Sequence, residues 1–121
     1  MYITSIGEIL FDVYESEKQI GGAPFNFIYH INKLTGCTNL VTAVGDDDAG
    51  NEILNFLNEV NISTKFVDIK KDVRTGEVLI QLDEKKIPDF TIFENRAYDY
   101  INLSQSEVDE IIAESKLIYF G

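Results

Sequence analysis

Two adjacent glycines before a proline form the stretch of the chain best suited to hold a small molecule. The stretch reads Gly21-Gly22-Ala23-Pro24-Phe25-Asn26 and opens an apolar segment. Glycines let a backbone approach a ligand closely, and proline is favoured at the start of a helix. A helix N-terminus offers free N–H groups, and the Asn26 amide can both donate to and accept from a hydroxyl. The pattern indicates a small-molecule cradle, and a plain strand-to-helix turn is the alternative.

Two charged side chains are further binding candidates. Asp12 lies in the apolar run Ile9-Leu10-Phe11-Asp12-Val13, where a carboxylate costs desolvation unless it is hydrogen-bonded. It is therefore a candidate for binding paired hydroxyls, unless strand alternation turns it to solvent. Arg96 follows an expected hairpin, and its guanidinium could reach a substrate oxygen or phosphate. The alternative for Arg96 is a solvated position at the rim.

An acidic run and a single cysteine suggest structural roles. Oxygen-rich clusters such as Asp46-Asp47-Asp48 can hold Mg²⁺ or Ca²⁺. This run lacks the spacing of a calcium-binding loop, and capping of the next helix by Asp47 or Asp48 explains an acid there. We expect no metal site. Cys37, the only cysteine, has no basic group at nucleophile spacing and is predicted to be a buried thiol.

Composition and charge exclude several classes of partner. The chain has 121 residues, a net charge of −11 and a pI near 4.3, so nucleic acid and anionic membranes are repelled. No run approaches the ~20 apolar residues of a membrane span. The N-terminus lacks the basic region of a signal peptide, and the lone cysteine forms no internal disulfide. We expect a cytoplasmic protein with no nucleic-acid or membrane partner.

Hydrophobic periodicity predicts an α/β domain. Buried strands are expected near residues 2–6, 40–44 and 64–69, with helices near 24–35 and 49–60 between them. In the first helix, Phe27, Ile28, Ile31 and Leu34 follow the helical period, and Gly36 is placed to end it. Strands that alternate with helices are typical of a mainly parallel sheet.

The later part of the chain breaks this alternation. Residues 77–83 and 89–94 alternate in polarity on either side of a polar turn, which predicts a β-hairpin. We expect it to form a small antiparallel sheet with residues near 12–20. The capping box Ser104-Gln105-Ser106-Glu107 opens a third helix, and residues 116–121 return as a strand.

Taken in order, these stretches resemble the ribokinase/PfkB family of carbohydrate kinases, and most closely its fructokinase-like members. The resemblance covers nearly the whole chain. Its segments are Ile6-Gly7-Glu8-Ile9-Leu10-Phe11-Asp12, Gly21-Gly22-Ala23-Pro24-Phe25-Asn26, Val44-Gly45-Asp46-Asp47-Asp48-Ala49-Gly50, Thr75-Gly76, Leu82-Asp83-Glu84, Ala97-Tyr98-Asp99-Tyr100-Ile101 and Leu117-Ile118-Tyr119-Phe120-Gly121. It implies a ribokinase-like, Rossmann-like fold with a mainly parallel sheet, flanking helices and a small antiparallel β lid. Residues 1–121 would form the N-terminal part of one domain, with lid segments near 12–20 and 75–95.

The resemblance also implies a function. The complete enzyme would phosphorylate a small sugar with ATP and Mg²⁺, with fructose as the first guess, and Asp12, Gly21, Gly22 and Asn26 would belong to the sugar site. Some family members also use an arginine near Arg96. The family's Gly-Ala-Gly-Asp stretch, with its catalytic aspartate, is missing, so we expect no catalytic residue, bound cofactor or kinase activity in this chain alone. A homodimer through the lid or a sheet edge is expected. A non-catalytic sugar-binding or dimerisation module and an unrelated α/β domain remain the alternatives.

Overall fold

A parallel sheet forms the body of the molecule. The computed structural model describes residues 1–121. The four strands of the body follow the spatial order β5-β4-β1-β8, and every neighbouring pair is parallel. They are β1 (Tyr2–Ile6), β4 (Thr38–Gly45), β5 (Val67–Lys70) and β8 (Ser115–Phe120). The predicted parallel α/β architecture is confirmed, and β8 lies at one edge of this sheet.

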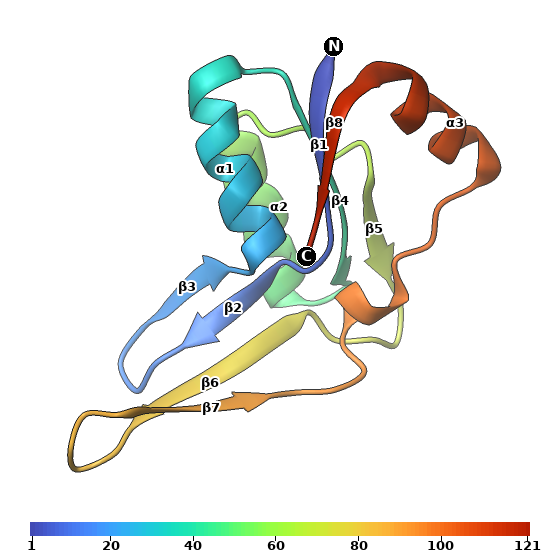
Figure 1. Cartoon of the computed structure of the whole chain (residues 1–121). Helices are drawn as coiled ribbons and strands as arrows, with labels where there is room; N and C mark the ends of the chain where they lie inside the picture. The colour runs from blue at the N-terminus through green and yellow to red at the C-terminus, as the bar shows by residue number, and fades with distance from the viewer.

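Helices cover both faces of the sheet, as Figure 1 shows. Helices α1 (Ala23–Thr35) and α2 (Asp48–Glu59) lie on one face, and α3 (Gln105–Glu114) lies on the other. Asp47 caps α2 by accepting a hydrogen bond from the Gly50 N–H. Ser104 and Glu107 form the predicted capping box at the start of α3. None of the three helices combines the length and apolar character needed to cross a bilayer.

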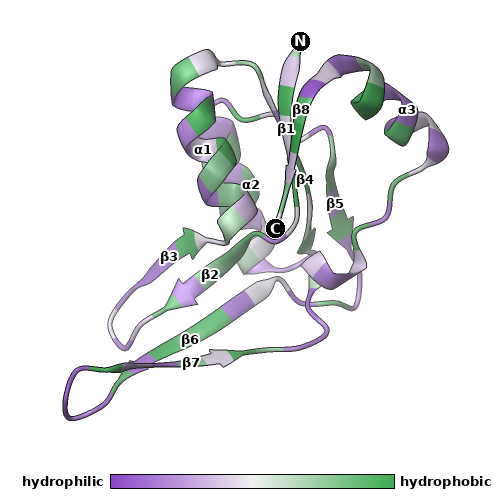
Figure 2. Ribbon diagram, in the orientation of Figure 1, coloured by the Kyte–Doolittle hydropathy of each residue, from purple (hydrophilic) through white to green (hydrophobic).

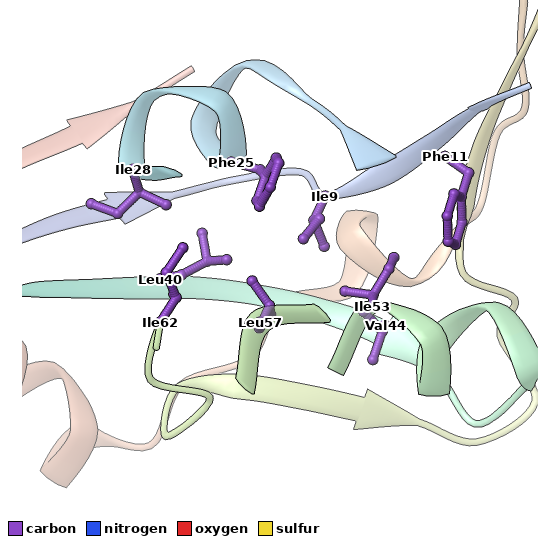
Figure 3. Close-up of a cluster of buried hydrophobic side chains, with 9 residues drawn as sticks. All are labelled: Ile9, Phe11, Phe25, Ile28, Leu40, Val44, Ile53, Leu57 and Ile62. Atoms are coloured by element: carbon purple, nitrogen blue, oxygen red, sulfur yellow. The ribbon is translucent and has the colours of Figure 1, made fainter. Parts of the chain in front are cut away.

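The main core lies between the sheet and the α1–α2 layer. Figure 3 shows its nine buried side chains: Ile9, Phe11, Phe25, Ile28, Leu40, Val44, Ile53, Leu57 and Ile62. Leu40 and Val44 point to this side because alternate residues of a strand face opposite sides. Val41 joins Phe66 and Ile111 on the α3 side. Figure 2 shows apolar residues alternating with polar ones along α1 and α2.

A second sheet projects from the body and is called the lid here. Its strand order is β3-β2-β6-β7, and its strands are β2 (Leu10–Val13), β3 (Lys18–Gly21), β6 (Gly76–Leu82) and β7 (Pro88–Ile92). The expected hairpin and its pairing with residues near 12–20 are present. The lid is mixed rather than antiparallel, however, because β2 and β6 both run outward from the body and pair in parallel.

Two residues expected in the core lie on the surface. Leu34 keeps 81% of its surface exposed, because it falls on the last turn of α1, beyond the sheet contacts made by Phe25 and Ile28. Cys37 is exposed rather than buried, since it lies in the turn between α1 and β4, before the buried run of β4 begins at Thr38. Helical period and residue type do not reveal where an element leaves its packing partner.

Candidate functional site

Asp12 lies against the bare backbone of Gly21. Strands β2 and β3 pair so that Leu10 is opposite Gly21 and Asp12 is opposite Gln19. A Cβ added at Gly21 would clash with the Asp12 carboxylate, so glycine leaves the space in which this side chain lies. Partial burial desolvates the carboxylate and raises the pKa of Asp12 above its usual value. The structure gives this acid no protein hydrogen-bond partner that would offset the desolvation.

The turn after Gly21 brings the start of α1 to the same place. Gly22 has φ of +103°, and a Cβ there would lie 2.6 Å from the Glu8 carbonyl oxygen. Both facts require glycine. The Asn26 N–H donates to the Gly22 carbonyl at 2.8 Å, which is the first turn of the helix. The Asn26 side chain is exposed and lines a surface pocket with Gln19, so it remains free to bind a ligand.

Tyr98 packs on the same face of the lid as Asp12. It belongs to the 3₁₀ turn η1 (Ala97–Tyr100) and packs against a small cluster of Leu10, Val78 and Ile80. Its ring covers Gly76, where an added Cβ would clash with it. Burial, followed by the nearby Asp99 and Glu8 carboxylates, raises the pKa of Tyr98. No local sequence pattern indicates which strand the Tyr98 ring covers.

Arg96 lies at the root of the hairpin rather than beside Asp12. Its guanidinium is 4.7 Å from the centre of the Phe93 ring, and Nη1 donates a long hydrogen bond of 3.4 Å to the Thr75 carbonyl. Its backbone N–H donates to Asp99 Oδ2 at 3.1 Å. The structure therefore brings Asp12, Gly21 and Gly22 together, with Asn26 one helical turn on, and leaves Arg96 in a separate polar cluster.

Asp47 has a structural set of partners. Its carboxylate accepts hydrogen bonds from the Gly50 N–H, the Thr75 N–H and the Thr75 hydroxyl. Burial acts to raise its pKa, but these hydrogen bonds and the charge of Arg74 outweigh that effect and lower it. Both carboxylate oxygens of Asp47 therefore accept hydrogen bonds from the protein, and no group of three or more acidic, His or Cys side chains is arranged to hold a metal ion.

The fold defines a ribokinase-like protein, and the comparisons with known proteins define its family. The profile of the pfkB family carbohydrate kinases matches residues 4–121. The chain therefore belongs to the pfkB family of carbohydrate kinases. It is 29% identical to the sugar kinase PH1459 of Pyrococcus horikoshii, over 98% of this chain and 41% of that protein. It is 28% identical to fructokinase-2 of Zea mays, over 86% of this chain and 31% of that protein.

Solved structures agree with this assignment. PH1459 from Pyrococcus horikoshii in complex with ATP superposes with a TM-score of 0.84 at 29% identity, over 98% of this chain and 42% of that one. The fructokinase of Halothermothrix orenii gives a TM-score of 0.84 at 24% identity, over 99% and 46%, and shows the shared fold. The chain spans less than half the length of these relatives.

Proposed function

We propose that this chain is the N-terminal part of an ATP-dependent sugar kinase, which transfers a phosphoryl group to a hydroxyl of a small, fructose-like carbohydrate. In this proposal Asp12, Gly21, Gly22 and Asn26 bind the sugar. Arg96 at the lid root contacts a substrate oxygen when the lid closes. The rest of the enzyme supplies the general base, and ATP and Mg²⁺ bind there.

The position of Asp12 is the observation that carries the proposal. A partly desolvated carboxylate without a protein donor gains most from a ligand that brings O–H donors. It lies over the bare backbone of Gly21 and close to the N-terminus of α1. Across β6 and β7, the lid face that carries Asp12 is apolar, with Val78, Ile80 and Ile92 on it. It would exclude water from the acceptor hydroxyl and so limit ATP hydrolysis.

Sugar binding to the chain tests the proposal. Fructose at a hundredfold excess over its dissociation constant should stabilise the chain by ~2.7 kcal/mol in thermal unfolding. Asp12→Asn should weaken binding by about 10- to 100-fold, because a hydrogen bond to a charged group contributes ~1.5–3 kcal/mol. Asp89→Asn is the matched control. Asp89 is an exposed acid on β7 and lies on the lid face opposite to the one that carries Asp12.

The possible results of this sugar-binding measurement lead to different conclusions. If Asp12→Asn binds fructose as tightly as the unsubstituted chain, the proposed sugar site is wrong. If fructose has no effect but ribose, another ketose or 2-keto-3-deoxygluconate stabilises the chain, the sugar class stands and fructose does not. We further expect no turnover of ATP by this chain alone, and sugar phosphorylation above background would contradict that expectation.

A non-catalytic binding or dimerisation module is the second candidate. It is favoured by three large apolar side chains on the lid, Leu82, Phe90 and Ile92, which keep 61%, 58% and 66% of their surface exposed. They lie on one face of the lid, because Val78, Ile80 and Leu82 pair with Ile92, Phe90 and Pro88. Exposed apolar patches of this kind mark interaction surfaces, and a second copy of the lid is the partner we propose.

A further inference from the structure

Hydrogen bonds between Asp47 and Thr75 connect the root of the lid hairpin to the body. Asp47 Oδ1 accepts from the Thr75 hydroxyl at 2.6 Å, and Asp47 Oδ2 accepts from the Thr75 N–H at 3.0 Å. The Thr75 hydroxyl also accepts from the Gly45 N–H at 2.9 Å. Asp47 also accepts from the Gly50 N–H, so four residues from the end of β4, the start of α2 and the start of β6 meet within one network.

The network is packed too tightly for any side chain at its two glycines. A Cβ at Gly45 would lie 2.5 Å from the Val73 carbonyl oxygen and 2.7 Å from the Thr75 nitrogen. A Cβ at Gly50 would clash with the Gly45 carbonyl, and it would lie 3.1 Å from the Thr75 hydroxyl. Thr75 is 3% exposed. Close packing of this kind holds two segments in one relative position.

The chain enters and leaves the hairpin next to this network. β6 starts immediately after Thr75. The chain that leaves β7 returns to the same segment, where the Ala97 N–H donates to the Arg74 carbonyl at 2.8 Å and Arg96 reaches the Thr75 carbonyl. The position of β6 is transmitted to the candidate sugar site, because β6 pairs with β2 and sets Val78 opposite Asp12.

We infer that Asp47 and Thr75 are positioning residues. The hydrogen bonds between them, called the clamp here, set the angle of the lid and hence the position of Asp12 over the substrate. The inference rests on the proposed function for its purpose, since a lid acts only over a bound substrate. At the edge of the lid opposite to β7, Lys18 of β3 forms an ion pair with Glu52 of α2 at 2.9 Å. Both of its side chains are solvent-exposed, so it contributes little to holding the lid.

The two clamp residues can be altered without a large change of shape. In Asp47→Asn the amide NH₂ group would replace one carboxylate oxygen and face a donor N–H or hydroxyl, so part of the network is lost. Thr75→Val removes the hydroxyl that binds Asp47 and Gly45, and Thr75→Ser restores it. Asp48→Asn is the matched control. It makes the same change of charge at an exposed neighbour that makes no hydrogen bond to the lid.

The test measures the distance between lid and body in the chain itself. Nitroxide labels are placed on the native Cys37, which is exposed on the body, and on Thr91→Cys, which is exposed on β7. Pulsed electron paramagnetic resonance gives the distance distribution without sugar or ATP, so its outcome does not depend on whether the proposed function is right. Far-UV circular dichroism checks that each variant is folded.

We expect one narrow distance peak for the unsubstituted, Asp48→Asn and Thr75→Ser chains, and loss of that peak to a broad distribution for Asp47→Asn and Thr75→Val. Unchanged peaks in folded Asp47→Asn and Thr75→Val would overturn the inference. If those variants do not fold, hydrogen exchange of the unsubstituted chain decides. The inference then requires the Thr75 and Ala97 amides to exchange more slowly than those of the hairpin turn, and equal rates would overturn it.

Discussion

At the scale of single residues, Asp12 is held in a setting that favours binding over stability. Burial raises the pKa of Asp12 in the folded chain, so the folded state holds this proton more tightly than the unfolded state. The stability from this group is present below the unfolded pKa, near ~3.9, and is lost as the pH rises through the folded pKa. At neutral pH the ionised Asp12 therefore lowers stability unless a ligand supplies donors.

The raised pKa of Asp12 leads to a prediction about stability. Asp12→Asn removes the buried charge and is expected to raise the midpoint of thermal unfolding at pH 7. It should give no such gain below about pH 3, where the carboxyl is protonated in both states. Thermal unfolding followed by circular dichroism across this range checks the prediction. A variant that is less stable than the parent at pH 7 would show that Asp12 has a stabilising partner within the protein.

The pKa shift of Asp47 is opposite in direction to that of Asp12. Its hydrogen bonds and Arg74 lower its pKa despite burial, so its contribution is present above the unfolded pKa, near ~3.9, and is lost as the pH falls through the folded pKa. Asp47→Ala is expected to cost ~1–2 kcal/mol at pH 7 through loss of the α2 cap, and the difference from the parent should shrink in acid. Urea unfolding at neutral and acidic pH measures this difference, and a constant difference would contradict it.

At the scale of elements, the start of α1 depends on Gly22 and its end depends on Gly36. Both have positive φ, but Gly22 also lies against the Glu8 carbonyl, whereas an added Cβ at Gly36 would meet nothing within 4 Å. We expect Gly36→Ala to cost ~1 kcal/mol from backbone strain alone. Gly22→Ala should cost clearly more, since strain of ~1–3 kcal/mol adds to the clash. Urea unfolding of the pair checks the ranking, and equal costs would show that the turn after β3 relaxes.

At the scale of the whole molecule, two apolar surfaces remain uncovered. β8 is one edge of the body sheet, and Phe120 keeps 79% of its surface exposed. The lid exposes Phe90 and Ile92 on one face. Unpaired sheet edges and exposed apolar side chains favour association with another chain. The net charge of −11 opposes association, so added salt should promote it.

The lid patch gives a prediction about association. Phe90→Lys is expected to shift the chain toward monomer in light scattering at high concentration, because it places a charge in the apolar face. Thr91→Lys, next along β7 and on the other face, is the control and should leave the molar mass unchanged. If both variants keep the molar mass of the parent, the lid patch is not the interface, and the β8 edge becomes the surface to alter.

The sequence by itself determined the features that depend on neighbouring residues. The strand and helix order, an acidic cap of α2 at Asp47 or Asp48, the Ser104 cap and the glycine turn before α1 were all predicted, because periodicity, capping and turn propensity are local properties. The family was indicated too, since its segments keep a fixed order along the chain. The hairpin was also local, and both of its strands were predicted.

Only the tertiary structure decided which distant residues meet. Asp12 lies over Gly21 because β2 and β3 pair in one register, and a shift of one residue would turn Asp12 to the other face. Asp47 reaches Thr75 across a long sequence separation, Tyr98 covers Gly76, and β2 pairs in parallel with β6. The surface positions of Leu34 and Cys37 likewise depend on where packing ends. These outcomes come from long-range packing, which no local pattern of residue types encodes.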